Sequence, residues 1–264
     1  HKGKAGRILA VAGSHDKTGA ALLVARGALR GGAGLITVGT TAEVVDRIAP
    51  TLNEVMAAEM VAHQADDAVA DRLGDFIETV DTAAVGSGLE THEGAVDAVR
   101  TVLASDAERA VLDADALNAV AGDLGEEPLA EFTDESTAIL TPHPGEMGRL
   151  CDCDTSEVLD HPIECTADYA AESGAFVVLK TATTIVAAPD GRIAVNKTGN
   201  PGMATGGTGD VLTGIVAARV TESTGDPFDD ICLAVWAHGR AGDLAAADIG
   251  ARGMSATDLA ERLP

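Results

Sequence analysis

Short apolar segments without a polar face recur along this chain, as in LAVA at 9–12 and FVVL at 176–179. A strand that is apolar on both faces is buried on both, which is typical of a parallel sheet covered by helices. The chain must then supply helices for both sides of that sheet, and this requirement constrains the fold more than any other feature. Segments of this kind predict strands at 7–12, 35–39, 83–85, 110–112, 138–140, 176–179, 184–188 and 193–196.

Helical patterns lie between and after these segments. The Ala-rich segment 18–30 has apolar residues at helical spacing, and Gly31 and Gly32 favour a helix end directly after it. Ser255 and Asp258 have the spacing of a capping box for a short helix at the end of the chain. The remaining helices are predicted at 67–79, 93–104, 115–121, 209–220, 229–247 and 256–262.

The turn Pro189-Asp190-Gly191 interrupts the alternation and predicts an antiparallel hairpin late in the chain. No internal repeat, low-complexity tract or linker divides the sequence. We therefore expect one α/β domain over residues 1–264, with a central, mostly parallel sheet, helices on both faces and a late antiparallel hairpin.

The chain is strongly acidic, with a formal net charge of −24. Because 46% of its residues are hydrophobic, disorder does not explain this charge. It indicates the hydrated surface of a protein from a salt-rich cytoplasm, where charge is screened over about 3 Å at 1 M salt. Nucleic acids and anionic membranes are not expected partners, since both bind positive patches. Without a signal peptide or a membrane-spanning run, the chain is expected to be soluble and cytosolic.

The cysteines could suggest a zinc site, because Cys151, Cys153, His161 and Cys165 form a C-x-C…H-x3-C arrangement. The C-x2-C pair that is usual in structural zinc sites is missing, however. Free thiols in a reducing cytosol are the expected state of these cysteines.

Ligands of an open parallel sheet bind beyond the carboxyl ends of its strands. The most informative segment at this edge is NPGMATGGTGD at 200–210. Its glycines allow a tight loop, and the helix that begins near Gly209 directs free N–H groups into that loop, which favours phosphate. Asp210 has two interpretations: it caps this helix, or it is a base that takes a proton from a hydroxyl attacking the phosphate.

The ordered motifs identify a family. DADALN at 113–118, TPHPGE at 141–146 and NPGMATGGTGDVLTG at 200–214, together with the opening AGS…GAALL…GALRGGAGLITV, closely resemble the ADP/ATP-dependent NAD(P)H-hydrate dehydratases. The resemblance runs from about Gly6 to Pro264 and implies a ribokinase-like fold. It also implies repair of NADH or NADPH hydrated at ring carbon 6: ADP, or ATP, with Mg²⁺ would phosphorylate the 6-hydroxyl, and phosphate would then be eliminated.

The resemblance also implies roles for individual residues, with Asp210 as the catalytic base. Mg²⁺ would be held through water by Glu146, which could equally be a first-turn carboxylate of the helix after Pro144. Residues that would contact the hydrated cofactor are Ala33, Gly88, His143 and Asp210. Residues that would bind the nucleotide are Lys180, Thr181, Ala182, Thr183, Thr184, Gly207, Thr208 and Gly209.

Two positions depart from the family pattern. Thr181 replaces the Gly of a K-G-x-x-T segment, where a side chain limits the close approach of the backbone to phosphate. Ser87 replaces Pro in a Gly-Pro-Gly loop, which is expected to change the stiffness of the loop more than its chemistry. Asp113 and Asp115 could face substrate or Mg²⁺, or cap a helix, and are not expected to be catalytic. The lone His238 is expected to be a surface or core residue.

Two other functions share parts of this pattern. An ATP-dependent kinase of a small vitamin precursor would need the same loop and the same Asp210, but such kinases more often carry Asn at the position of His143. A noncatalytic nucleotide sensor would not need Asp210. Ala-rich surface helices favour a homo-oligomer. The chain also lacks an initial methionine, which suggests a missing N-terminal domain; in this family that is often an epimerase for the hydrate.

Overall fold

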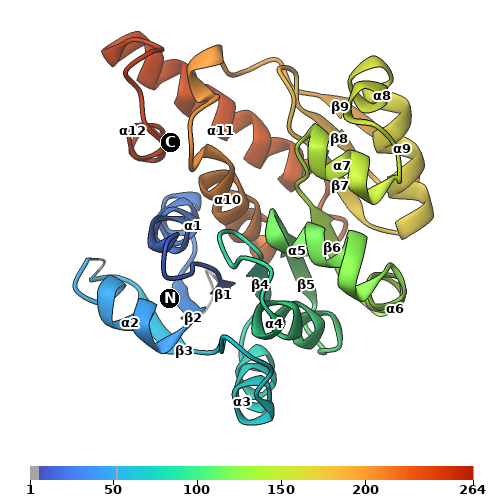
Figure 1. Cartoon of the computed structure of the whole chain (residues 1–264). Coiled ribbons are helices and arrows are strands. Elements are labelled where there is room, and N and C mark those ends of the chain that lie inside the picture. The colour runs from blue at the N-terminus through green and yellow to red at the C-terminus, as the bar shows by residue number, and fades with distance from the viewer. Residues whose placement is uncertain (1–5, 52, 264) are drawn as a thin grey trace.

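The computed structural model describes residues 6–51 and 53–263. In chain order the strands of this part are β1 (Arg7–Val11), β2 (Leu35–Thr40), β3 (Met56–Glu59), β4 (Thr82–Val85), β5 (Arg109–Leu112), β6 (Thr137–Leu140), β7 (Phe176–Leu179), β8 (Ile185–Ala187) and β9 (Ile193–Val195). They form one sheet in the order β3-β2-β1-β4-β5-β6-β7-β8-β9 (Figure 1).

Most of the sheet is parallel. All neighbouring strands from β3 across to β7 pair in parallel. β8 pairs antiparallel with β7, and β9 pairs antiparallel with β8 through the turn that contains Pro189 and Gly191. The α/β fold with a mostly parallel sheet and a late hairpin is therefore confirmed.

Helices surround the sheet, and several of them were not predicted, namely α2, α6, α8 and α9. The helix at the end of the chain begins at the capping box of Ser255 and Asp258, as its sequence indicated. The helices are α1 (Thr18–Gly31), α2 (Ala42–Ile48), α3 (Asp67–Ile77), α4 (Glu93–Leu103), α5 (Asp115–Ala119), α6 (Glu127–Glu135), α7 (Pro144–Leu150), α8 (Thr155–Asp160), α9 (Pro162–Ser173), α10 (Thr208–Glu222), α11 (Phe228–Ile249) and α12 (Ala256–Ala260), with a π-helical turn η2 (Val120–Leu124) and a 3-10 turn η3 (Pro201–Met203).

The core lies in two layers, one on each face of the sheet. Along β1, Ile8 and Ala10 face the layer that contains α1, α10 and α11, whereas Leu9 and Val11 face the layer that contains α3, α4 and α9. This alternation explains why the strands have no polar face: each side chain is buried against helices on one side or the other.

Contact between α1 and α10 depends on glycine. A Cβ on Gly27 would overlap the carbonyl oxygen of Val211, and a Cβ on Gly214 would overlap that of Val24. The two helices therefore pack backbone against backbone. This close packing fixes the first turn of α10 beside the carboxyl edge of the sheet.

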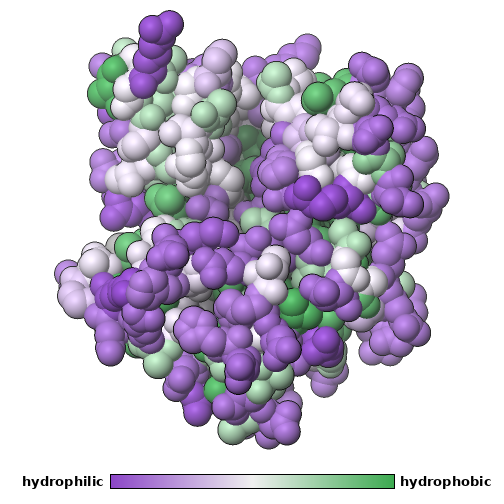
Figure 2. Space-filling view, in the orientation of Figure 1, coloured by the Kyte–Doolittle hydropathy of each residue, from purple (hydrophilic) through white to green (hydrophobic). Residues whose placement is uncertain are grey.

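The molecular surface is largely hydrophilic on the face shown in Figure 2, which has a hollow near the top between the part with α11 and α12 and the part with α7 and α8. Within residues 6–51 and 53–263, no helix is both long enough and apolar enough to cross a bilayer.

Candidate active site

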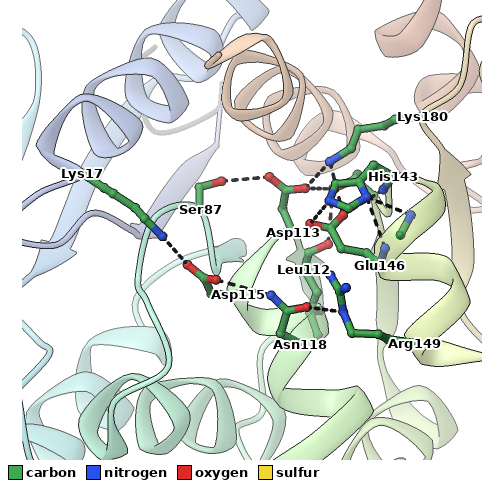
Figure 3. Close-up of polar contacts among 12 residues, drawn as sticks. Lys17, Ser87, Leu112, Asp113, Asp115, Asn118, His143, Glu146, Arg149 and Lys180 are labelled. Carbon is green, nitrogen blue, oxygen red and sulfur yellow. Dashed lines mark hydrogen bonds and ion pairs between the residues drawn. The ribbon is translucent and has the colours of Figure 1, made fainter. Parts of the chain in front are cut away.

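Three strand ends and the starts of two helices bring polar residues together at the carboxyl edge of the sheet. Ser87 follows β4, Asp113 follows β5, and Lys180 follows β7, while α7 carries Glu146 close by (Figure 3). Asp210 lies in the first turn of α10. These residues are far apart in sequence, and the parallel topology places them side by side.

Asp113 is the centre of this cluster. Its carboxylate is buried and accepts hydrogen bonds from Lys180 Nζ at 2.6 Å, Thr141 Oγ1 at 2.8 Å and Ser87 Oγ at 3.1 Å. Burial by itself would raise the pKa of Asp113, but the charge of Lys180 and the three hydrogen bonds bring it below its usual value. Asp113 is therefore ionised, and it does not cap a helix.

Lys180 is not a solvated lysine at a strand end. Its side chain is 20% exposed, and its Nζ lies 3.9 Å from Glu146 Oε2 in addition to its bond to Asp113. Burial would lower the pKa of Lys180, but the charges of Asp113 and Glu146 raise it above its usual value. A Cβ on Gly209 would lie 3.5 Å from the same Nζ, so this protonated amine stands beside the first turn of α10.

The first turn of α10 provides free backbone donors. Its N-cap is Gly207, whose φ of +91° is left-handed and whose position has no side-chain cap. The N–H groups of the first turn of a helix have no partner within the helix, so they can bind an anion here. His238 on α11 contacts this turn, with its Nε2 at 2.9 Å from the Thr208 carbonyl oxygen. It is a buried core residue, as the sequence allowed, and burial lowers its pKa to about 4.

Asp210 belongs to this first turn but does not cap the helix. Burial, followed by the negative charge of Asp113, raises the pKa of Asp210 to about 6, although Ser87, Lys180 and Lys17 act in the opposite direction. A carboxylate that titrates this close to neutrality is a more effective proton acceptor than an ordinary aspartate. The geometry thus argues against the cap, and the role of Asp210 as base stays a prediction.

Two cavities meet at the start of α10. The larger, of about 600 Å³, is lined by Lys180, Thr208 and Gly209 together with apolar side chains such as Leu212. The smaller, of about 410 Å³, is lined by Asp210 and the residues around it. The first turn of α10 therefore separates two spaces, with the amine in one and the carboxylate in the other.

Most residues of the predicted nucleotide set line the larger cavity, namely Lys180, Thr181, Ala182, Thr184, Thr208 and Gly209. Gly207 lines the smaller cavity, with Gly88 and Asp210. Thr183 lines neither, but its N–H and its carbonyl both bond the hydroxyl of Thr181. At the position where the family pattern has Gly, the side chain of Thr181 therefore forms hydrogen bonds within its own loop.

His143 and Glu146 form a capping box at the start of α7. The Nδ1 of His143 accepts from the N–H groups of Gly145 and Glu146, and Glu146 Oε2 accepts from His143 N at 2.8 Å. Glu146 was predicted either to hold Mg²⁺ through water or to be a first-turn carboxylate of the helix after Pro144. Its hydrogen bond to His143 N is that of a first-turn carboxylate. His143 remains half exposed, with Nε2 at 3.1 Å from Glu146 Oε1.

Ala33 is the predicted site residue that the structure does not bring to this edge. It follows the end of α1, where its N–H bonds the Ala28 carbonyl, and it packs against the core. Leu35, two residues later, begins β2 beside Gly6. Ala33 thus lies at the amino-terminal edge of the sheet, opposite Lys180.

Sequence reasoning missed three features of the smaller cavity and its surroundings. Lys17 lines it and pairs with Asp115 at 3.4 Å. Asp115 also accepts from the Glu90 N–H at 2.8 Å, so it orders the loop after β4 rather than capping α5. The hydroxyl of Ser87 is buried against Asp113. A serine inside a glycine loop at a strand end was the available signal for the last of these.

In the described part of the chain, no group of three or more His, Cys, Asp or Glu side chains could hold a metal ion. Cys151, Cys153, Cys165 and Cys232 are free thiols. Burial raises the pKa of the Cys151 thiol to about 12, which makes it a poor nucleophile.

Solved structures support the fold. An ADP/ATP-dependent NAD(P)H-hydrate dehydratase from Bacillus subtilis, co-crystallised with ATP and Mg²⁺, superimposes with a TM-score of 0.83 at 32% identity, covering 100% of this chain and 89% of that one. A ribokinase-like superfamily protein from Enterococcus faecalis gives a TM-score of 0.86 at 25% identity, covering 100% of this chain and 87% of that one.

Sequence comparisons agree. The chain is 36% identical to the ADP-dependent (S)-NAD(P)H-hydrate dehydratase of Bacillus subtilis, covering 100% of this chain and 90% of that enzyme. It is 42% identical to the bifunctional NAD(P)H-hydrate repair enzyme of Moorella thermoacetica, covering 100% of this chain but 49% of that enzyme, so it spans about half the length of such relatives. The sequence model described as NAD(P)H-hydrate dehydratase matches residues 8–264, and the chain therefore belongs to this ribokinase-like family.

Proposed function

We propose that this protein converts hydrated NADH or NADPH back to the intact cofactor, with ADP as the phosphoryl donor. The observation that carries the proposal is the pair of cavities on either side of the first turn of α10. A nucleotide in the larger cavity and a hydroxyl in the smaller one would meet across this turn. The names of the relatives, which include an ADP-dependent dehydratase, support the same reaction.

The larger cavity suits a nucleoside phosphate. Leu212, Val235 and Met203 provide apolar walls for a base, and Lys180 stands at the end where the phosphates would reach α10. Phosphoryl transfer depends mainly on positioning and on stabilising charge at the transferring oxygens. Lys180 and the free N–H groups of the first turn of α10 supply both.

The smaller cavity suits the hydrated ring. Asp210 would accept the proton of the 6-hydroxyl while the oxygen of that hydroxyl attacks the terminal phosphorus of the nucleotide. The bond from this phosphorus to the bridging oxygen of the nucleotide would break. The C–O bond of the phosphorylated intermediate then breaks as the ring nitrogen donates its electron pair. Phosphate leaves, a proton is lost from the neighbouring carbon, and the ring double bond is restored.

Mg²⁺ fits this site as an ion carried chiefly by the nucleotide. It commonly binds one or two carboxylates plus substrate phosphates and keeps several waters. The oxygens of Asp113 and Glu146 already face Lys180, so water-mediated contact with Glu146 is the role open to the protein. The ion would neutralise negative charge on the phosphates.

The test uses the purified chain with hydrated NADH, Mg²⁺ and either ADP or ATP, in buffer of high salt. We expect the ultraviolet absorbance band of NADH to return, faster with ADP, and inorganic phosphate to appear in equal amount. A stable phosphorylated product without recovery of NADH would indicate a kinase. Absence of any turnover with both nucleotides would refute the dehydratase proposal. The homo-oligomer predicted from the sequence remains a separate prediction, which light scattering can check.

A further inference from the structure

The smaller cavity contains a cation to which the reaction steps above give no role. It is Lys17, the basic residue among the described residues that line this cavity, where Asp16, Asp115 and Asp210 supply three carboxylates. The side chain of Lys17 is 49% exposed, whereas that of Asp115 is 15% exposed. The amine of Lys17 therefore stands at the mouth of the cavity, in contact with both the solvent and the interior.

Hydrogen bonds that extend away from the cavity set the position of this amine (Figure 3). Lys17 Nζ lies 3.4 Å from Asp115 Oδ2, which also accepts from the Glu90 N–H at 2.8 Å. Asp115 Oδ1 accepts from Asn118 Nδ2 at 3.4 Å, and Asn118 Oδ1 accepts from Arg149 Nε at 2.9 Å. Because Asp115 is held on both of its oxygens, it fixes the place where the amine of Lys17 stands.

The backbone that contacts Asp115 is strained at two residues. Glu90 has a φ of +67° and Ala114 a φ of +49°, both in the left-handed region that favours glycine. Such conformations persist where the surrounding structure holds them, and they are frequent at ligand sites. Gly88, in the same loop as Glu90, packs against Lys17, since a Cβ on Gly88 would lie 3.1 Å from the Cβ of Lys17. The loop after β4 thus supports both Lys17 and its partner Asp115.

Lys17 retains donors for a ligand. An ammonium group has three N–H donors, and Asp115 takes one of them. A half-exposed ion pair contributes little to stability, so the amine can turn toward another anion without a large loss. The space beside it is open, because a Cβ on Gly19, which lines the same cavity, would meet nothing within 4 Å. An anionic group that passes the mouth of the cavity can therefore reach Lys17.

We propose that Lys17 binds the diphosphate of the hydrated cofactor and makes the protein selective for the dinucleotide over a substrate without phosphate. The inference rests on the proposed function, which places the hydrated ring beside Asp210. A cavity of about 410 Å³ is near the lower end of the range of about 300–1,000 Å³ for pockets of drug-sized ligands, so the larger dinucleotide must extend out of it. One ribose separates the ring from the diphosphate, whereas the 2′-phosphate of NADPH lies beyond a second ribose. The diphosphate is therefore the anionic group that passes Lys17.

The first test compares hydrated NADH with hydrated reduced nicotinamide riboside, which has the same ring but no phosphate. Lys17→Met removes one charge-assisted contact at a half-exposed position, so it should raise KM for hydrated NADH about tenfold and leave kcat within about twofold. KM for the riboside should not change. Lys17→Arg keeps the charge and should retain most of the affinity. Lys197→Met is the matched control, because it removes the same charge from an exposed residue outside both cavities, and it should leave both KM values unchanged.

Binding of intact NADH, which carries the same diphosphate, provides a readout without turnover. Calorimetric titration in excess ADP, which keeps the larger cavity filled, should give a Kd about tenfold higher for Lys17→Met than for the unmodified chain or Lys197→Met. NADPH should give the same ratio.

An unchanged Kd or KM in Lys17→Met would overturn the assignment, as would an absence of NADH binding by the unmodified chain. An equal rise in KM for the riboside would also overturn it, and so would an effect confined to NADPH, which would indicate the 2′-phosphate. Absence of turnover by the unmodified chain would refute the proposed function, whereas the ratio of the NADH Kd values would still test the role of Lys17.

Discussion

Replacing Asp210 by Asn should stabilise the protein while abolishing its reaction. Asp210 is partly buried, and its pKa is raised from the usual 3.8 to about 6, chiefly by burial and then by Asp113. The folded state therefore binds a proton more tightly than the unfolded state. Stability from this group is fully present below about pH 4 and is lost as the pH rises through about 6.

The magnitude follows from the same pKa. A value of about 6 in place of 3.8 corresponds to about 3 kcal/mol lost above pH 7. Because Asp210 is not completely shielded from water, about 1–3 kcal/mol is the expected gain for Asp210→Asn at pH 8. For a chain of this length that gain raises Tm by about 2–6 °C. The gain should shrink between pH 6 and pH 4 and be absent below that range.

Asp258→Asn is the matched control, because its carboxylate has the opposite property. Hydrogen bonds from Ser255 lower the pKa of Asp258, so its stabilising contribution is present at neutral pH and is lost on acidification. This variant should lower Tm at pH 8. Thermal unfolding of both variants at pH 8 and pH 4.5, in the same salt, measures the two signs. An Asp210→Asn protein that is no more stable than its parent at pH 8, or that retains full activity, would refute the reasoning.

Three further changes test other parts of the site. Gly207→Ala should lower the unfolding free energy by about 1–2 kcal/mol and abolish nucleotide binding, because Gly207 has a left-handed φ and a Cβ there would overlap Leu23. Gly206→Ala is the control, since a Cβ on Gly206 meets open space. An equal nucleotide Kd for the two variants would contradict this assignment. Lys180→Met should destabilise the fold by about 3–5 kcal/mol, because it leaves the buried carboxylate of Asp113 without its cation. Lys197→Met, at an exposed position, should leave stability unchanged, and denaturant unfolding of both variants measures the difference. Molar potassium chloride should raise Tm and lower KM for both anionic substrates, because the chain carries a charge of −24; a flat response would count against the prediction of a salt-adapted surface.

Local sequence patterns predicted the elements whose residues are of one kind along their length, either apolar or rich in glycine. The strands from β1 to β9, except β3, are apolar enough to be recognised, and the glycine loop before α10 indicated an anion site. β3, with the sequence MAAE, lies at the edge of the sheet, where Met56 and Glu59 are exposed. Ala and Glu are depleted in strands, so this short segment lacks the β-branched and aromatic residues that would have indicated a strand.

Partners across the sheet could not be predicted in the same way. Asp113 and Lys180 are 67 residues apart, and their bond exists because β5, β6 and β7 lie side by side in parallel. From the sequence, Asp113 before a helix was a reasonable cap. The positive φ of Ala114 turned it inward instead, and that conformation leaves no mark in the residue type. Ala33 shows the opposite case, where a motif position suggested contact and the topology placed it at the other edge.

The charges at the carboxyl edge explain why the base lies here despite its cost to stability. Asp113, Glu146 and Asp210 face one amine, that of Lys180, so the site is already negative before an anionic nucleotide enters. When Asp210 accepts a proton from the hydroxyl, one of these negative charges is removed as charge develops on the phosphoryl group. Burial, and after it the repulsion from Asp113, raises the pKa of Asp210 in the free protein, and both therefore favour proton transfer during the reaction. A site with less burial and less negative charge around Asp210 would be more stable, but the aspartate would be a weaker base.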